Sequence, residues 1–325
     1  MATIIKPAVL LLFTCIICCY PVSAETKSEK KAKTPRNKRF SGYLLIGGGL
    51  HSSKLSQLDT ETDKRLTTLD KSTKTRNRAI PLLMGEISYN FNDDVTRLTL
   101  ENEFDIYPWI SVSRKFDGFG DISLKGKYSS EEVWNNPYTT SGQRKTTDKE
   151  SGAFQLAWDE IFGLPLMTSY TLENVKVKDD IIGSINPDLK RDGLIHTVET
   201  GFPLFFSGNH TVFMILSFDK AEMDGESNSY NGMGGMLNYS YETLKWNINT
   251  TLGRTENKYK KRHSEFNKTR DDITSLIGSE LTINEPFNQK NYFISIMANW
   301  MQTDSNIDFF KSRELITGIG IGYKF

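Results

Sequence analysis

The chain has 325 residues, with 40 Lys and Arg against 40 Asp and Glu, and 38% of its residues are hydrophobic. This composition is too polar for a bundle of apolar membrane helices. The formal net charge of zero argues against a protein that binds nucleic acid by neutralising phosphates.

Residues 1–24 have the pattern of a secretory signal peptide. Lys6 precedes an apolar run from Ala8 to Cys19, and Val22 and Ala24 are small residues at the positions that precede a cleavage site. A membrane anchor would need about 20 apolar residues. We therefore expect cleavage after Ala24 and export across the inner membrane. All three cysteines lie in this segment, so the mature chain is expected to have no disulfide and no cysteine-based site.

Residues 25–39 form a short basic segment without apolar periodicity, and Pro35 would interrupt a helix there. The sequence predicts a disordered basic tail on the periplasmic side. The remaining residues, 40–325, are predicted to form one domain.

From Phe40 onward the hydrophobic pattern has a period of two, which is typical of strands. It is clearest at the end of the chain, where Ile319, Ile321 and Tyr323 alternate with glycines. Fourteen strands are predicted, and 12 are the alternative because residues 109–116 carry the weakest pattern. The predicted ranges are 40–51, 79–91, 95–104, 109–116, 121–128, 151–162, 167–177, 191–205, 210–221, 227–241, 244–256, 269–284, 290–303 and 312–325.

The connections between these strands differ in length. Those near residues 92–94, 163–165 and 207–209 are short, whereas residues 53–78, 129–150, 178–190 and 257–268 are long and polar. Soluble β-sandwiches also alternate, but strands of roughly 10 residues with short turns at one end and long loops at the other are typical of outer-membrane barrels. The fold class is therefore all-β, a transmembrane antiparallel β-barrel with short periplasmic turns and long extracellular loops. The final aromatic residues, Tyr323 and Phe325, resemble the signal by which the barrel-assembly machinery recognises such chains.

Several passages resemble the bacterial family named domain of unknown function 2860, a set of presumed Gram-negative outer-membrane proteins. They are residues 40–42, 134–138, 144–148, 267–272, 303–309 and 322–325. The resemblance implies a β-barrel in the cell outer membrane. It brings no catalytic residue, ligand or cofactor that can be transferred to this chain.

No catalytic or metal site is predicted. His51, His196, His210 and His263 have no serine or aspartate partner at a recognisable spacing, so we expect no enzymatic activity. Residues 219–226 are acidic but do not match a calcium-binding loop. The loop of residues 54–78 is rich in Lys and Arg, and two interpretations stay open: it binds lipopolysaccharide phosphates, or it is a solvated mobile loop.

The leading hypothesis is a passive channel for small hydrophilic solutes, because a barrel of about 14 strands approaches the size that leaves an aqueous lumen. Strand parity places seven acids and four bases inside, which predicts weak cation preference. The loop of residues 129–150 is long enough to fold inwards, and its basic end would then narrow the pore. The alternative is a non-conducting surface protein whose long loops bind lipopolysaccharide or a partner. The predicted lumen-lining residues are Glu86, Arg97, Glu101, Glu103, Lys125, Lys127, Asp159, Glu173, Glu199, Lys245 and Glu280.

Overall fold

The computed structural model describes residues 39–70, 73–91, 95–102 and 107–325. The predicted signal peptide and nearly all of the predicted basic tail lie outside the described residues.

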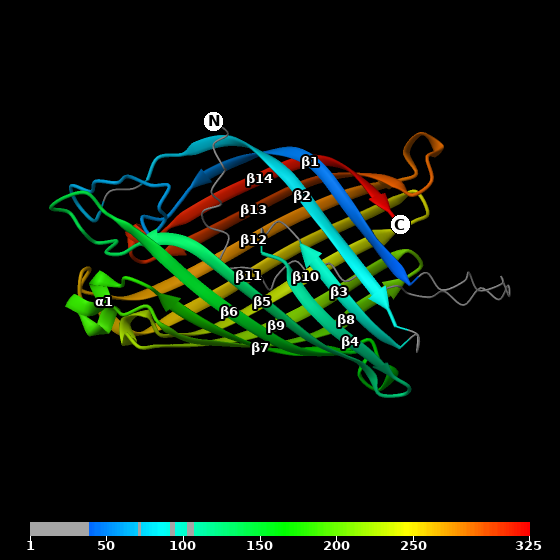
Figure 1. Ribbon diagram of the computed structural model, residues 1–325, viewed down its shortest axis with the longest axis horizontal. Coiled ribbons are helices and arrows are strands. Elements are labelled where there is room, and N and C mark those ends of the chain that lie inside the picture. Colours follow the sequence, from blue (N-terminus) through cyan, green and yellow to red (C-terminus); the bar gives the residue numbers. More distant parts are fainter. Residues whose placement is uncertain (1–38, 71–72, 92–94, 103–106) are drawn as a thin grey trace.

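Fourteen antiparallel strands form one closed barrel (Figure 1), as the alternation predicts. The segment with the weakest pattern, residues 109–116, is a strand with the predicted bounds, so the alternative of 12 strands is wrong. The strands are β1 (Phe40–Lys54), β2 (Arg76–Asn90), β3 (Thr96–Asn102), β4 (Trp109–Phe116), β5 (Gly120–Trp134), β6 (Thr146–Asp159), β7 (Met167–Val177), β8 (Gly193–Ser207), β9 (His210–Met223), β10 (Tyr230–Glu242), β11 (Trp246–His263), β12 (Lys268–Asn284), β13 (Tyr292–Ser305) and β14 (Ser312–Lys324).

The barrel closes between its first and last strands. β1 pairs with β14 from Tyr43 opposite Lys324 to Lys54 opposite Arg313, and every other strand pairs with its neighbours in sequence. Closure leaves no free sheet edge, and each unpaired backbone group in hydrocarbon would cost several kcal/mol.

The two faces of the wall differ in chemistry. Ile46 of β1 and Ile319 of β14 are 57% exposed and lie on the outer face, whereas their neighbours Leu45 and Gly320 are buried on the inner face. The outer face therefore presents apolar side chains, as a surface in contact with lipid requires.

The two ends of the barrel also differ. The long connections and the short helix α1 (Ile181–Ile185) lie at one end, on the left in Figure 1, and the C-terminus lies at the other. Five single-turn 3₁₀ helices lie in the connections: η1 (Ile161–Gly163), η2 (Pro187–Leu189), η3 (Glu226–Asn228), η4 (Pro286–Asn288) and η5 (Asp308–Phe310). Within the described ranges, no helix has the length and apolar character needed to cross a membrane.

Two predicted loops are shorter than expected, because the strands continue beyond the apolar zone. β5 and β6 leave residues 135–145 between them, and β11 and β12 leave only residues 264–267. The strand extensions are mostly polar, so the alternation of apolar and polar residues is lost there. Cross-strand contacts such as the ion pair of Lys149 with Glu131, at 2.7 Å, hold them together.

Candidate functional site: the lumen wall and the loop cap

Most of the predicted lumen-lining residues lie on the inner face of the barrel. This face is identified by alternation with exposed apolar residues, as for Glu199 next to Val198 and Lys125 next to Leu124. The described residues at such positions are Glu86, Arg97, Glu101, Lys125, Lys127, Asp159, Glu173, Glu199 and Glu280. Glu103 lies outside the described residues.

Lys245 does not lie on the wall. β10 ends at Glu242 and β11 begins at Trp246, so Lys245 is an exposed residue of the turn between them. Thr243 fixes this turn, since its Oγ1 accepts a hydrogen bond from Trp246 N at 2.8 Å. The predicted strand 244–256 starts two residues before β11, because Leu244 matches the apolar pattern in the sequence. Leu244 is 97% exposed instead.

Several inner-wall charges neutralise one another. Lys125 Nζ lies 3.1 Å from Glu101 Oε1, and Arg270 pairs with Asp272 at 2.5 Å. Arg270 and Asp272 were not predicted, because they lie on β12 beyond its apolar part. Ion pairs of this kind cancel much of the field that an unpaired charge would give the lumen.

Among the described residues, four acids of the inner wall, Glu86, Glu199, Asp219 and Glu280, accept side-chain hydrogen bonds from hydroxyl groups alone. Glu199 on β8 is 6% exposed and accepts a hydrogen bond from Ser169 at 3.2 Å. Asp219 on β9 accepts one from Thr197 at 2.6 Å. Asp219 lies within the predicted strand 210–221, where it alternates with apolar residues, but it is absent from the predicted lumen residues.

An apolar cluster covers another part of the inner wall. It consists of Leu45, Leu82, Met84, Phe293 and Met297. The glycines of β14 make room for it: a Cβ at Gly320 would lie 2.6 Å from Leu45 Cδ2, and one at Gly322 would lie 2.0 Å from the Phe293 ring. The expectation of a polar interior therefore holds for only part of the wall, since β1, β2 and β13 pack apolar side chains inside.

The long connections form a second hydrophobic core at their end of the barrel. We call it the cap, and its segments are residues 55–70, 135–145, 178–192, 224–229, 264–267 and 306–311. The buried residues of its core are Leu66, Tyr138, Ile182, Leu189, Ile307, Phe309 and Phe310.

The strand order places this core across the mouth. The segment between β13 and β14 contributes Phe309, and the segment between β7 and β8 contributes Leu189. β14 and β7 are seven strands apart in a ring of 14, which is opposite in the barrel. A core with members from both sides must extend over the lumen, so the cap covers the extracellular mouth.

Arg144 joins two segments of the cap. Its side chain is 2% exposed and donates hydrogen bonds to Gln57 O at 2.6 Å and Thr62 Oγ1 at 3.0 Å. Its guanidinium group lies 4.3 Å from the centre of the Trp134 ring. Burial lowers the pKa of Arg144 to about 10, so the group remains charged at neutral pH.

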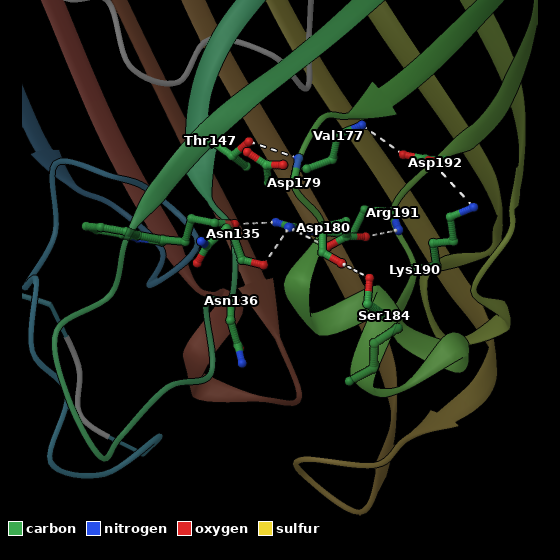
Figure 2. A network of polar contacts seen from close by, with 12 residues as sticks. Asn135, Asn136, Thr147, Val177, Asp179, Asp180, Ser184, Lys190, Arg191 and Asp192 are labelled. Carbon is green, nitrogen blue, oxygen red and sulfur yellow. Dashed lines mark hydrogen bonds and ion pairs between the residues drawn. The ribbon is translucent and has the colours of Figure 1, made fainter.

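A second arginine ties the segment that contains α1 to the rest (Figure 2). Arg191 pairs with Asp180 at 2.6 Å and donates to the carbonyl oxygens of Trp134, at 2.8 Å, and Asn135, at 3.2 Å. Thr147 Oγ1 accepts a hydrogen bond from Asp179 N at 3.0 Å. α1 is therefore fixed to the ends of β5 and β6.

Residues 55–70 of the predicted loop 54–78 pack into the cap, so this part of the loop is not solvated throughout. Leu55, Gln57, Asp59 and Leu66 are all at most 3% exposed. Gln57 N donates to Phe309 O at 3.0 Å, which connects this loop with the last one. The sequence missed this packing because the apolar residues of the loop have no period.

The four histidines have structural partners. His196 and His210 contact Tyr170 and Tyr239 at 2.8 and 2.9 Å, and His263 contacts Tyr138 at 2.9 Å. His51 contacts Glu314 at 2.9 Å. Over the described part of the chain, no group of three or more His, Cys, Asp and Glu side chains could hold a metal ion.

The two residues of the predicted assembly signal lie at the seam between β1 and β14. The Tyr323 ring packs against Tyr292, with centroids 5.1 Å apart. Phe325 N donates to Gly42 O at 3.0 Å, and Gly42 N donates to Phe325 O at 3.3 Å. The last residue thus completes the pairing of the first and last strands.

The family model described as "Protein of unknown function (DUF2860)" matches residues 40–324, which is the whole barrel. No curated protein matches the sequence.

Three solved structures are similar to this chain. The outer-membrane channel DcaP of Acinetobacter baumannii has 10% identity and a TM-score of 0.44 over 88% of this chain and 97% of its own. An anion-selective porin from Comamonas acidovorans has 10% identity and a TM-score of 0.41 over 88% and 99%. A loop-deletion mutant of the Vibrio cholerae outer-membrane protein OmpT has 8% identity and a TM-score of 0.40 over 89% and 100%. Such distant likenesses say nothing about the solute or the pore of this chain.

Proposed function

Because this chain belongs to the DUF2860 family of proteins of unknown function, its function has to be argued from its own barrel. We propose that it is an outer-membrane channel for small hydrophilic solutes with weak cation preference. The supporting observation is the inner wall of β5 to β9, which carries Lys125, Asp159, Glu173, Glu199 and Asp219 inside a closed barrel of 14 strands. Barrels of eight strands are filled by their own side chains, whereas 16–18 strands leave an aqueous channel.

The cation preference rests on the balance of charged residues on the inner face. At the predicted lumen positions that the structure describes there, six acids stand against three bases, and one of the bases, Lys125, is paired with Glu101. We infer that the net charge of this face is negative. Salt screens the field of this charge over about 10 Å at 0.1 M, so the discrimination is modest.

The channel conducts only when the cap leaves the mouth. The cap is therefore a gate in this proposal, and the conformation described above is the closed one. Solutes would pass after the segments that share the core around Tyr138 and Phe309 have separated.

Reversal potentials across a KCl gradient in planar bilayers test the proposal. We expect the wild-type protein to favour K⁺, and the double variant Glu199→Gln, Asp219→Asn to lose most of that preference. Glu256→Gln is the matched control, because Glu256 lies on the outer face of β11 and is 42% exposed. Anion preference in the wild type, or equal effects of the two variants, would contradict the assignment.

The alternative function is a non-conducting surface protein whose loops bind lipopolysaccharide or a partner. The cap favours it, because a shared hydrophobic core presents a fixed surface at the extracellular end. A variant with a weakened cap separates the two functions. If neither the wild type nor Arg144→Ala conducts ions, the surface-binding function replaces the channel.

A further inference from the structure

A cluster of ionisable groups lies where the cap meets the barrel wall. On the wall, His51 of β1 lies 2.9 Å from Glu314 of β14, and both side chains are 4% exposed. Arg78 of β2 donates from Nε to His51 Nδ1 at 3.1 Å. Nδ1 therefore faces a donor, and Nε2 faces the Glu314 carboxylate.

Two residues of the cap complete the cluster. Arg78 Nη1 forms an ion pair with Glu61, which ties the wall to the loop between β1 and β2. Asp59, two residues earlier, is 2% exposed, and its Oδ1 accepts a hydrogen bond from Glu61 N at 2.6 Å. Within the described chain, Asp59 Oδ2 is buried and has no hydrogen-bond partner.

The backbone at Asp59 is a junction of the cap. Its carbonyl oxygen accepts hydrogen bonds from Trp134 Nε1 at 2.9 Å and from Thr62 Oγ1 at 2.5 Å. Trp134 in turn lies under Arg144. A change at Asp59 therefore acts directly on the contact between two cap segments.

An ionised Asp59 would be poorly accommodated in this position. The charged groups that act on it are Glu61, Glu314 and Arg78, and of these the two acids oppose a negative charge. His51 and Arg144 lie one contact further away, bonded to Arg78 and to Thr62. Arg78 is already bonded to Glu61 and His51, and Arg144 to carbonyl groups. A buried carboxylate with an unpartnered oxygen is costly when it is charged and much less so when it is protonated.

We propose that Asp59 is a proton-sensitive latch, which holds the cap closed when it is protonated and loosens the cap when it ionises. The proposal deepens the function given above by naming how the gate is regulated. Its test has one readout that does not need conduction, so failure of the channel and failure of the latch remain distinguishable.

The direction of the pH effect follows from proton linkage. Burial raises the pKa of Asp59 from 3.8 to about 7, with the neighbouring acids adding to the effect. In an open cap the pKa of Asp59 would return to its ordinary value of 3.8. Opening therefore releases a proton between about pH 4 and pH 7, and the opening equilibrium rises up to about tenfold per pH unit in that window. Above about pH 7 it levels off. The cap is tightest in acid.

Cysteine accessibility measures this opening directly. Residues 39–325 contain no cysteine, so Ile307→Cys places a single thiol of the barrel in the buried core of the cap. Its rate of modification by a thiosulfonate reagent is divided by that of Ser141→Cys, an exposed cap position, to remove the pH dependence of the thiol itself. Protein without an introduced cysteine gives the blank.

We expect the rate ratio to rise from pH 5 to pH 7 and then to stay level. Asp59→Asn should keep the ratio low and flat, because the amide cannot ionise. Asp70→Asn is the matched control in the same loop, since Asp70 is exposed, and it should behave like wild type. His51→Gln tests whether the neighbouring imidazole contributes.

Three outcomes overturn the latch: a flat ratio in wild type, an Asp59→Asn variant that keeps the wild-type pH dependence, or a pH dependence that His51→Gln abolishes and Asp59→Asn does not. Conductance over the same pH range is the second readout. If accessibility follows pH as expected but no pH gives conduction, the latch stands and the channel function fails.

Discussion

The wall of the barrel and the cap over its mouth use apolar residues in opposite ways. On the wall, Ile46 and Ile319 are 57% exposed and face outward, and the interior holds most of the polar groups. In the cap, Leu66 and Phe309 are at most 2% exposed and pack against one another. The wall is thus built for lipid outside, whereas the cap is built like the core of a soluble protein. A single chain satisfies both because its long connections project beyond the membrane.

The two regions also differ in what holds them together. The wall is held by backbone pairing, which depends little on any one side chain. The cap is held by a few side chains that each bond to backbone groups of other segments, such as Arg144 and Arg191. Single substitutions should therefore damage the cap more than the wall, and the experiments below test this difference.

The largest effect is expected from Arg144→Ala. The change removes the hydrogen bonds of the guanidinium group to Gln57 O and Thr62 Oγ1, and it removes the cation above Trp134. Hydrogen bonds to a charged group contribute about 1.5–3 kcal/mol each, so we expect the cap to lose about 3 kcal/mol or more while the barrel stays folded. Limited trypsin cleavage at Lys64 and Arg65 measures the opening. Lys145→Ala, at an exposed neighbour, should change nothing, and equal cleavage in both variants would refute the role of Arg144.

A smaller effect is expected from Gly47→Ala at the seam of the wall. A Cβ at Gly47 would lie 2.2 Å from Ile319 O, so the backbone of β1 or β14 must shift. Such crowding costs about 1–3 kcal/mol, and we expect a lower temperature of unfolding in detergent. Gly48→Ala is the matched control, because a Cβ there would meet only Ile80 O, at 3.9 Å. If the two variants unfold alike, the seam tolerates side chains and the glycines have another purpose.

Deletion of Phe325 should have a comparable or smaller effect on stability. It removes the two backbone hydrogen bonds to Gly42, which are worth about 1 kcal/mol each. It also removes the aromatic end of the predicted assembly signal. We expect lower amounts in the outer membrane and more periplasmic degradation, measured by immunoblotting of fractions. Replacement of Phe325 with Tyr keeps the backbone bonds and an aromatic ring, and it should restore normal levels.

The smallest effect is expected from Trp134→Phe. The ring remains under Arg144, but the donor to Asp59 O is lost. One such hydrogen bond contributes about 1 kcal/mol, so trypsin should cleave the cap only slightly faster than in wild type. Cleavage as fast as in Arg144→Ala would show that the tryptophan, and not the arginine, organises the cap.

The sequence predicted the wall well because period-two alternation is a local signal. Each of the 14 strands overlaps a predicted range, and the bounds of β4 and β7 agree to the residue. Errors occur where alternation stops. The polar extension of β11, residues 257–263, falls in a range predicted to be a loop, and Lys245 falls in a predicted strand because Leu244 continues the apolar pattern.

The cap could not be predicted in the same way. The loop of residues 129–150 was expected to be able to fold inwards, but nothing near Tyr138 in the sequence indicates that its partners are His263 and Phe309. Those contacts join positions that only the closed ring brings together. The sequence shows that the glycines of β14 lie on one face of the strand. It does not show that apolar side chains from β1, β2 and β13 occupy the space beside them.

The interlocking of distant cap segments has a consequence for biogenesis. Tyr138 and His263 are 125 positions apart, Asn186 and Ser264 are 78 apart, and Gln57 bonds to Phe309 near the end of the chain. Contacts so remote in sequence form slowly, because the chain must first be brought together elsewhere. Backbone pairing around the ring supplies that proximity. The cap should consequently mature after the barrel has closed, and its resistance to protease in pulse–chase experiments would date the final step of assembly rather than insertion itself.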